Sequence, residues 1–130
     1  MLDTNTVSAL VKSRDSTLNP ILEDKPLCIS VIAEAELHFG LARRVVNADL
    51  RRIVENFLVS VDIRPWTSVS AQRYGPLRAE LEALGKSLAP MDLLIATHAL
   101  AEHCTLISAD RVFAQVPGLR LLDWSASTSK

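Results

Sequence analysis

Residues 92–110 read DLLIATHALAEHCTLISAD. This stretch contains an apolar segment of helix length and, after it, a short apolar run. Residues 92–101 carry so few polar side chains that we expect a helix buried inside the protein. Residues 105–108 have the length and composition of a buried strand. A helix that leads into a buried strand is typical of α/β proteins.

The alternation of strand and helix continues toward both ends of the chain. Residues 2–3 and 27–29 are predicted strands, each followed by a helical pattern, and Ser30 is a candidate N-cap for the second of these helices. Such alternation predicts an α/β domain with a central, largely parallel sheet of about four to five strands flanked by helices. The other predicted segments are helices at 4–12, 31–46, 48–60 and 68–84, strands at 61–63 and 119–122, a loop with a helical turn at 14–25, and a helical turn at 110–114.

Two of the predicted helices carry a clear apolar face. The helix at 48–60 is expected to follow the N-cap Asn47, and the helix at 68–84 is expected to end before Gly85. The side chains expected to point inward are Leu50, Ile53, Val54, Phe57 and Leu58 on the first helix and Leu77, Leu81 and Leu84 on the second.

The composition indicates one folded domain. Of the 130 residues, 48% are hydrophobic and 22% are charged, which suffices for an apolar core. Residues 1–124 are expected to form the domain, and 125–130 a flexible polar tail. Cys28 and Cys104 lie in apolar surroundings, as reduced thiols of cytoplasmic proteins do, and no segment has the pattern of a signal peptide or membrane span. We therefore expect a cytoplasmic protein.

Four acidic residues are candidates for one shared site: Asp3, Glu36, Asp92 and Asp110. Asp3 ends the first predicted strand, and Glu36 lies two turns into the helix after the second. Asp92 opens the apolar helix, and Asp110 follows the next strand. Ligands of open α/β sheets bind at the carboxyl ends of the strands, where we expect these residues to converge. Packed carboxylates repel one another unless cations neutralise them, and Mg²⁺ or Mn²⁺ prefers oxygen ligands.

Such a cation site can activate water and stabilise the leaving oxygen of a phosphodiester. The net charge of −1 argues weakly against a nucleic-acid-binding protein, since these proteins are often basic. Acidic residues gathered in one cation-binding pocket would leave the remaining surface positive, so the net charge does not exclude this class.

The acidic residues also have structural interpretations. Asp92 after Pro90, and Asp110 after Ser-Ala, could each be a helix N-cap. Glu36 lies in an apolar helix, where an inward-pointing carboxylate is costly without a partner. Zinc is a weaker hypothesis, because His98 and His103 are five residues apart and would lie on different helix faces.

Basic residues near the acids are candidates for contacts with substrate phosphates. Arg43 and Arg44 lie on the predicted helix of Glu36, and Lys86 lies in the loop before Asp92. A solvated helix face explains the two arginines equally well.

Several short motifs, each present once, follow one another along the chain. They are Asp3-Thr4-Asn5, Ala35-Glu36-Leu37 with Gly40, Asp92 with Ile95-Ala96, Ser108-Ala109-Asp110 with Phe113, and Val116-Pro117-Gly118-Leu119 followed by Asp123-Trp124. This ordered set resembles the PIN-domain ribonucleases, and in particular the VapC toxins of bacterial toxin–antitoxin pairs.

The resemblance implies a PIN-domain fold and a metal-dependent endoribonuclease that cleaves RNA, with tRNA among the candidate substrates. Asp3, Glu36, Asp92 and Asp110 would match the family's acidic quartet that binds Mg²⁺, with Mn²⁺ as a substitute. Asn5 and Ser108 would support this quartet. The resemblance also implies a homodimer and a VapB-type antitoxin, whose C-terminal segment blocks the acidic groove and whose N-terminal part binds operator DNA.

Three other interpretations stay open. The first is a PIN-fold module that binds nucleic acid or a partner protein without cleavage, and retention of all four acids argues against it. The second is a DNA nuclease, which generally needs additional elements to thread DNA. The third is a receiver or phosphatase-like domain with Asp3 as nucleophile, which would require a further acid nearby and a lysine after a later strand.

Overall fold

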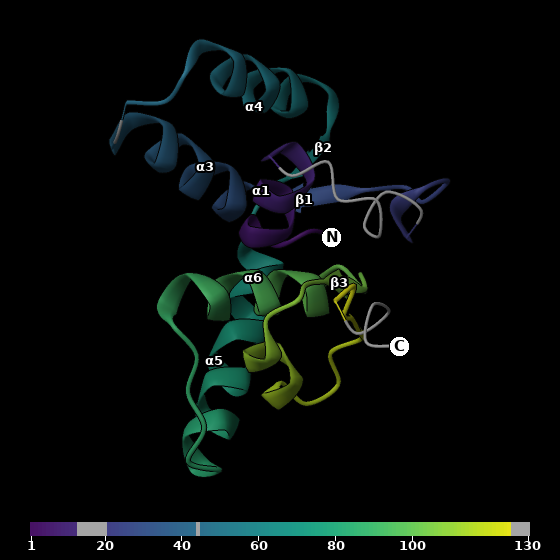
Figure 1. The fold of residues 1–130 in the computed structure, drawn as a ribbon. Helices are drawn as coiled ribbons and strands as arrows, with labels where there is room; N and C mark the ends of the chain where they lie inside the picture. The colour runs from purple at the N-terminus through teal and green to yellow at the C-terminus, as the bar shows by residue number, and fades with distance from the viewer. Residues whose placement is uncertain (13–20, 44, 126–130) are drawn as a thin grey trace.

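The computed structural model of the chain describes residues 1–12, 21–43 and 45–125. Figure 1 shows α3 and α4 in one half of the molecule and α5 and α6 in the other, with α1 and β1 between them. None of the described helices combines the length and apolarity that a membrane crossing requires. The helices are α1 (Thr4–Lys12), α3 (Val31–Arg43), α4 (Ala48–Ser60), α5 (Ser68–Ala83), α6 (Pro90–Ala101) and the 3-10 helix η1 (Arg111–Gln115); the strands are β1 (Cys28–Ser30), β2 (Asp62–Arg64), β3 (Leu106–Ile107) and β4 (Leu121–Leu122).

All pairings among the described strands are parallel, as the sequence predicts. Strand β1 pairs with β2, and β3 pairs with β4. Leu2 joins the two pairs through parallel bridges to Ile29 and Ile107. The order across the sheet is therefore β2, β1, Leu2, β3 and β4. Because the carboxyl ends of parallel strands meet at one edge, Asp3 lies at the middle of that edge.

The core is formed by this sheet and by side chains from α1, α3, α5, α6 and η1. Leu2, Ile29 and Leu106 are completely buried in the sheet. On α6, the side chains of Ile95 and Ala96 are buried as the apolar composition of this helix predicts. The apolar segment 92–110 thus packs at the centre of the protein.

Local sequence signals account for the boundaries of several helices. The predicted bounds of α1 and α4 are confirmed, and Asn47 Oδ1 accepts a 2.7 Å hydrogen bond from the backbone N–H of Leu50. Ser30 Oγ accepts a 3.0 Å bond from the N–H of Ile32, which confirms this cap of α3. Helix α3 ends by Arg43 rather than at residue 46, because Asn47 needs an extended backbone to cap α4.

Two predicted inward-pointing side chains are exposed, and two predicted segments lie outside the described residues. On α4 Val54 is buried, and Phe57 and Leu58 pack against the core as predicted. Ile53 is 38% exposed because it faces a shallow surface hollow beside Val11 rather than the core. Leu84 is 55% exposed, since it occupies the position at which the chain leaves α5 before Gly85. Most of the loop predicted at 14–25, and the tail 126–130, lie outside the described residues.

Candidate active site

Asp3 is a buried carboxylate with two fixed partners. Its Oδ1 accepts a 2.9 Å hydrogen bond from the backbone N–H of Thr6, which caps the first turn of α1. Its Oδ2 accepts a 2.6 Å bond from the hydroxyl of Ser108, which follows β3. These bonds fix the orientation of the carboxylate at the sheet edge, and each oxygen keeps a lone pair for another partner.

Ser108 contacts both the first and the fourth predicted acid. Its Oγ accepts a 3.0 Å hydrogen bond from the backbone N–H of Asp110 while it donates to Asp3. Asp110 also caps η1, because its Oδ1 accepts a 3.0 Å bond from the N–H of Val112. The N-cap interpretation of Asp110 is therefore confirmed, and this cap uses one of its two carboxylate oxygens.

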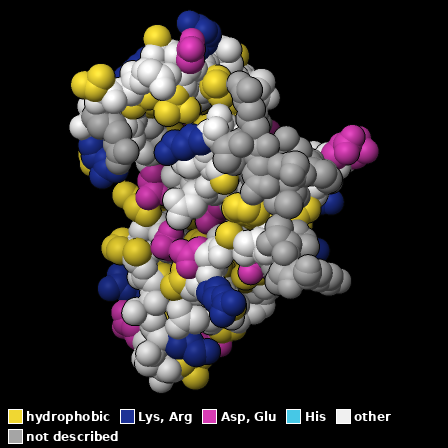
Figure 2. All heavy atoms as spheres, viewed as in Figure 1, with side chains coloured by type: hydrophobic (Ala, Val, Ile, Leu, Met, Phe, Trp, Pro, Cys, Tyr) yellow, Lys and Arg dark blue, Asp and Glu magenta, His cyan; other side chains and the backbone are white. Residues whose placement is uncertain are grey.

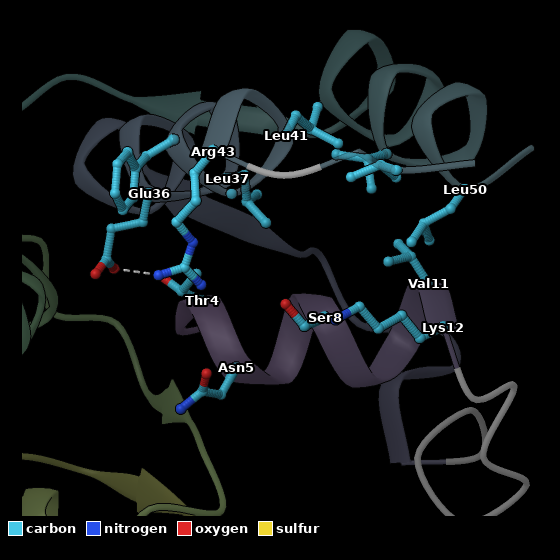
Figure 3. A pocket seen from close by; sticks show the side chains of 14 residues that line it. Thr4, Asn5, Ser8, Val11, Lys12, Glu36, Leu37, Leu41, Arg43 and Leu50 are labelled. Carbon is cyan, nitrogen blue, oxygen red and sulfur yellow. Dashed lines mark hydrogen bonds between the residues drawn. The ribbon is translucent and has the colours of Figure 1, made fainter. Parts of the chain in front are cut away.

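Glu36 is held by a residue that the sequence did not single out. Its Oε1 accepts a 2.5 Å hydrogen bond from the hydroxyl of Thr4. Figure 3 shows the two side chains pointing toward each other from α3 and α1. Because Thr4 follows Asp3 directly, this bond ties the second acid to the first. Thr4 is part of the motif Asp3-Thr4-Asn5, but nothing in the sequence assigned it a role or indicated a partner 32 residues away.

Asp92 is the third residue of α6 and does not cap it. The helix begins at Pro90 and its N-cap position is Ala89, so the N-cap interpretation of Asp92 is wrong. The side chain is half-buried, and among the described residues it has no hydrogen-bond donor or cation as partner. An ionised carboxylate in this position is costly unless a partner outside the chain compensates it.

The environment of Asp92 shows that the four predicted acids act on one another. Burial raises the pKa of Asp92, and the negative charges of Asp110, Glu36 and Asp3 raise it further, in that order. Figure 2 shows Asp and Glu side chains gathered near the middle of one face, with Lys and Arg side chains above and below. The convergence predicted from the strand ends is therefore present in the fold.

The donor chemistry of this site fits a hard divalent cation. Its four side chains offer only carboxylate oxygens, which Mg²⁺ and Mn²⁺ prefer. Within residues 1–12, 21–43 and 45–125, no three Asp, Glu, His or Cys side chains close on one point as a finished coordination sphere would. A cation bound among the four carboxylates would offset their mutual repulsion.

A groove extends from Glu36 between α1, α3 and α4. Its volume is about 450 Å³, and Thr4, Glu36 and Arg43 line it. The predicted supporting residue Asn5 also lines this groove and is exposed. Figure 3 shows Lys12 reaching in from α1, the wall opposite to α3.

The three predicted phosphate contacts fall in different places. Arg43 lies in the groove beside the acids. Lys86 lines a separate, smaller cavity between α5 and the start of α6, together with Arg78. Arg44 lies outside the described residues.

His98 belongs to the core rather than to the acidic site. It is completely buried on α6, and its Nδ1 lies 2.8 Å from Oγ of Ser30, the cap of α3. Burial lowers the pKa of His98, and the charge of Glu102 opposes this effect. Nε2 of His98 lies 3.8 Å from Oε2 of Glu102, and the backbone of Pro65 also acts on the ring to raise its pKa.

Comparison with known proteins identifies the family. The PIN-domain family model matches residues 1–119. Ribonuclease VapC2 of Rickettsia felis is 35% identical over 129 residues, which span 95% of this chain and 96% of that protein. The tRNA(fMet)-specific endonuclease VapC of Shigella flexneri is 30% identical over 128 residues, 96% of this chain and 97% of that protein.

Solved structures agree with the sequence matches. The VapBC2 complex of Rickettsia felis, bound to a DNA fragment from its promoter, contains a chain with a TM-score of 0.87 and 31% identity, covering 94% of this chain and 96% of that one. The DNA-bound VapBC of Salmonella typhimurium gives a TM-score of 0.88 at 29% identity, covering 95% and 96%. These matches exclude the receiver or phosphatase-like interpretation. Their extent over both chains shows that this protein belongs to the PIN-domain family, within the VapC ribonucleases of toxin–antitoxin systems.

Proposed function

We propose that this protein is a Mg²⁺-dependent endoribonuclease toxin that hydrolyses phosphodiester bonds of RNA. Asp3, Glu36, Asp92 and Asp110 would be its catalytic residues and would hold the cation, for which Mn²⁺ can substitute. The observation that carries the proposal is the accumulation of three negative charges around the half-buried carboxylate of Asp92. A divalent cation bound there would compensate these charges, activate water and stabilise the leaving oxygen.

The neighbouring residues have separate tasks in this proposal. Ser108 and the N–H of Thr6 orient Asp3, and Thr4 orients Glu36. Asp92 has no described partner that competes with a cation. Asn5 stays a predicted support of the acidic quartet, and Arg43, in the adjoining groove, is proposed to contact the RNA. The location of Lys86 in a separate cavity gives it less support as a substrate contact, and Arg44 stays a prediction.

The substrate class and the partners follow from the relatives. One relative carries the name of a tRNA(fMet)-specific endonuclease, which makes tRNA the first substrate to test. The two solved relatives described above are VapBC complexes bound to DNA. We infer a VapB-type antitoxin that covers the acidic groove of this protein with its C-terminal segment and binds operator DNA itself. A homodimer in the cytoplasm, formed by domains of residues 1–124, completes the proposal.

The proposal is tested by incubating the purified protein with total tRNA, first with Mg²⁺ and then with excess EDTA. Cleavage is expected only with Mg²⁺, and Asp92→Asn should abolish it. The matched control is Asp49→Asn, since Asp49 is an exposed aspartate in the first turn of α4. Cleavage that persists in EDTA or in Asp92→Asn would contradict the proposal. Binding of RNA without cleavage by the wild type would instead support the non-catalytic PIN-fold module.

A further inference from the structure

Phe39 is an exposed aromatic residue beside the acidic site. All six aromatic residues of the chain lie in its described part, and Phe39 alone is exposed, at 63%. It follows Glu36 by three residues on α3 and therefore lies on the same face of that helix, one turn away. Phe39 and Glu36 both line the groove between α1, α3 and α4.

A cation lies on the face of this ring. Cζ of Arg43 is 5.3 Å from the centroid of the Phe39 ring, a cation–π distance. Arg43 follows Phe39 by four residues and lines the same groove. Along one wall of the groove, the order is thus a carboxylate of the acidic site, an exposed ring and a guanidinium.

The other wall of the groove adds a second cation. Lys12 lines it from α1, beside Ser8 and the apolar Val11. Among the described residues that line the groove, Glu36 is the only acid, and Lys12 and Arg43 are the cations. The volume of about 450 Å³ lies within the usual range for a pocket that holds a small organic ligand.

We propose that Phe39 and Arg43 form a subsite that stacks one unpaired base of the RNA substrate beside the acidic site, with Lys12 on a phosphate of the same strand. Single-stranded RNA is bound by stacking of its bases on aromatic rings and guanidinium planes, and by cations along its backbone. Both kinds of group lie here within two helical turns of Glu36. This inference rests on the proposed function, in which RNA is the substrate, and it adds a base-binding site to the protein.

A peptide segment of a partner protein is the competing occupant of this groove. The groove is also lined by apolar side chains that would suit a peptide: Val11, Leu37, Leu41, Val46, Leu50 and Val54. The exposed ring of Phe39 and the exposed cations Lys12 and Arg43 are instead the combination of groups that binds single-stranded RNA. A nucleotide would contact the ring and the cations together. The observations therefore favour RNA, and the peptide becomes an outcome of the test.

The test measures binding of fluorescein-labelled single-stranded oligoadenylate RNA by anisotropy, in an Asp92→Asn background that prevents cleavage. Phe39→Ala should weaken binding about tenfold, the order expected for one base–aromatic stack. Phe39→Tyr should restore affinity because the ring is retained. The matched control is Val69→Ala on α5, because Val69 is also 63% exposed and lies outside the groove.

A series of oligonucleotides with one abasic position each sharpens the test. With Phe39 present, one abasic position should cost affinity, and this cost should vanish in Phe39→Ala. Equal abasic penalties in both proteins would overturn the inference. Normal RNA binding by Phe39→Ala would also overturn it, and if the same substitution in the protein with Asp92 intact abolished inhibition of cleavage by a VapB-type antitoxin, the groove would be a peptide site.

Cleavage of RNA and the ring-dependent abasic penalty test the nuclease proposal and the stacking subsite separately. If the wild type cleaves no RNA but shows the ring-dependent abasic penalty, the stacking subsite stands and the nuclease proposal falls. If the wild type cleaves tRNA with Mg²⁺ and Phe39→Ala leaves KM and kcat unchanged, the nuclease proposal stands and the subsite falls.

Discussion

Ser108 Oγ donates a 2.6 Å hydrogen bond to Oδ2 of Asp3, across 105 residues of sequence. Both side chains are buried, and the same hydroxyl accepts a 3.0 Å bond from the backbone N–H of Asp110. The side chain of Ser108 therefore fixes both the carboxylate of Asp3, next to Leu2 in the middle of the sheet, and the backbone of Asp110 after β3.

Ser108→Ala is expected to lower both stability and cleavage. It leaves a buried carboxylate oxygen and a backbone N–H unsatisfied, which costs about 1–3 kcal/mol of unfolding free energy. Urea denaturation measures this loss. The matched control is Ser70→Ala, because Ser70 Oγ is buried and has no hydrogen-bond partner among the described residues. Equal stability of the two variants would show that the bond to Asp3 contributes nothing.

Asp92→Asn is expected to stabilise the protein when no divalent cation is bound. In the wild type, the pKa of the Asp92 carboxyl is raised in the folded state, so the folded protein binds this proton more tightly than the unfolded chain does. This contribution to stability is lost as the pH rises through the raised pKa, and at neutral pH the ionised carboxylate is destabilising. The melting temperature of Asp92→Asn in EDTA should therefore exceed that of the wild type.

Mg²⁺ should reverse this order by raising the melting temperature of the wild type, since a ligand that binds only the folded state stabilises it. Asp92→Asn should respond less, and Asp49→Asn should respond as the wild type does. A wild-type melting temperature that does not change at millimolar Mg²⁺ or Mn²⁺ would count against a cation among these carboxylates.

Thr4→Val is expected to weaken cation binding more than it weakens the fold. The variant keeps the shape of the side chain and removes the 2.5 Å bond to Glu36, so the carboxylate loses its fixed orientation. The concentration of Mn²⁺ needed for half of the thermal shift should rise, and Thr4→Ser should restore it. Thr67→Val is the control, because Thr67 is exposed and its side chain makes no cap hydrogen bond. An unchanged Mn²⁺ response in Thr4→Val would rule out this role for Thr4.

Acid should destabilise the protein through His98. Burial lowers the pKa of His98 in the folded state, the charge of Glu102 and the backbone of Pro65 oppose this effect, and Arg64 adds to it. The unfolded chain therefore takes up the proton first, and this contribution to stability is lost as the pH falls below the ordinary value of about 6.5. Urea unfolding at pH 7.5 and 5.5 should show the loss.

His98→Gln should flatten this pH dependence, whereas His103→Asn should retain it. His103 is exposed, and its φ of 56° is one that Asn tolerates well. If His98→Gln keeps the full slope between these pH values, another group is responsible for it.

The sequence predicted best those features that local signals determine. Helix α4 begins after Asn47 as expected because an N-cap needs only its own side chain and the next three residues. The burial of Ile53 and Leu84 was predicted wrongly, because helical spacing shows which side chains share a face but not whether another element covers that face.

The acidic site was predictable in outline and not in detail. Parallel strands bring their carboxyl ends to one edge, so the convergence of Asp3 and Asp110 followed from the order of the elements. The bond between Thr4 and Glu36 depends on how α1 and α3 pack, which the sequence does not express. The closeness of Phe39 to Glu36 follows from their three-residue spacing on α3, but the exposure of its ring could not be predicted from the sequence.

The most direct test of the cation site is anomalous X-ray diffraction from crystals of the protein soaked in Mn²⁺. An anomalous peak is expected between the carboxylates of Asp3, Glu36, Asp92 and Asp110, and it should be lost in Asp92→Asn crystals. Ordered carboxylates without a peak between them, or Mn²⁺ bound only elsewhere on the protein, would contradict it.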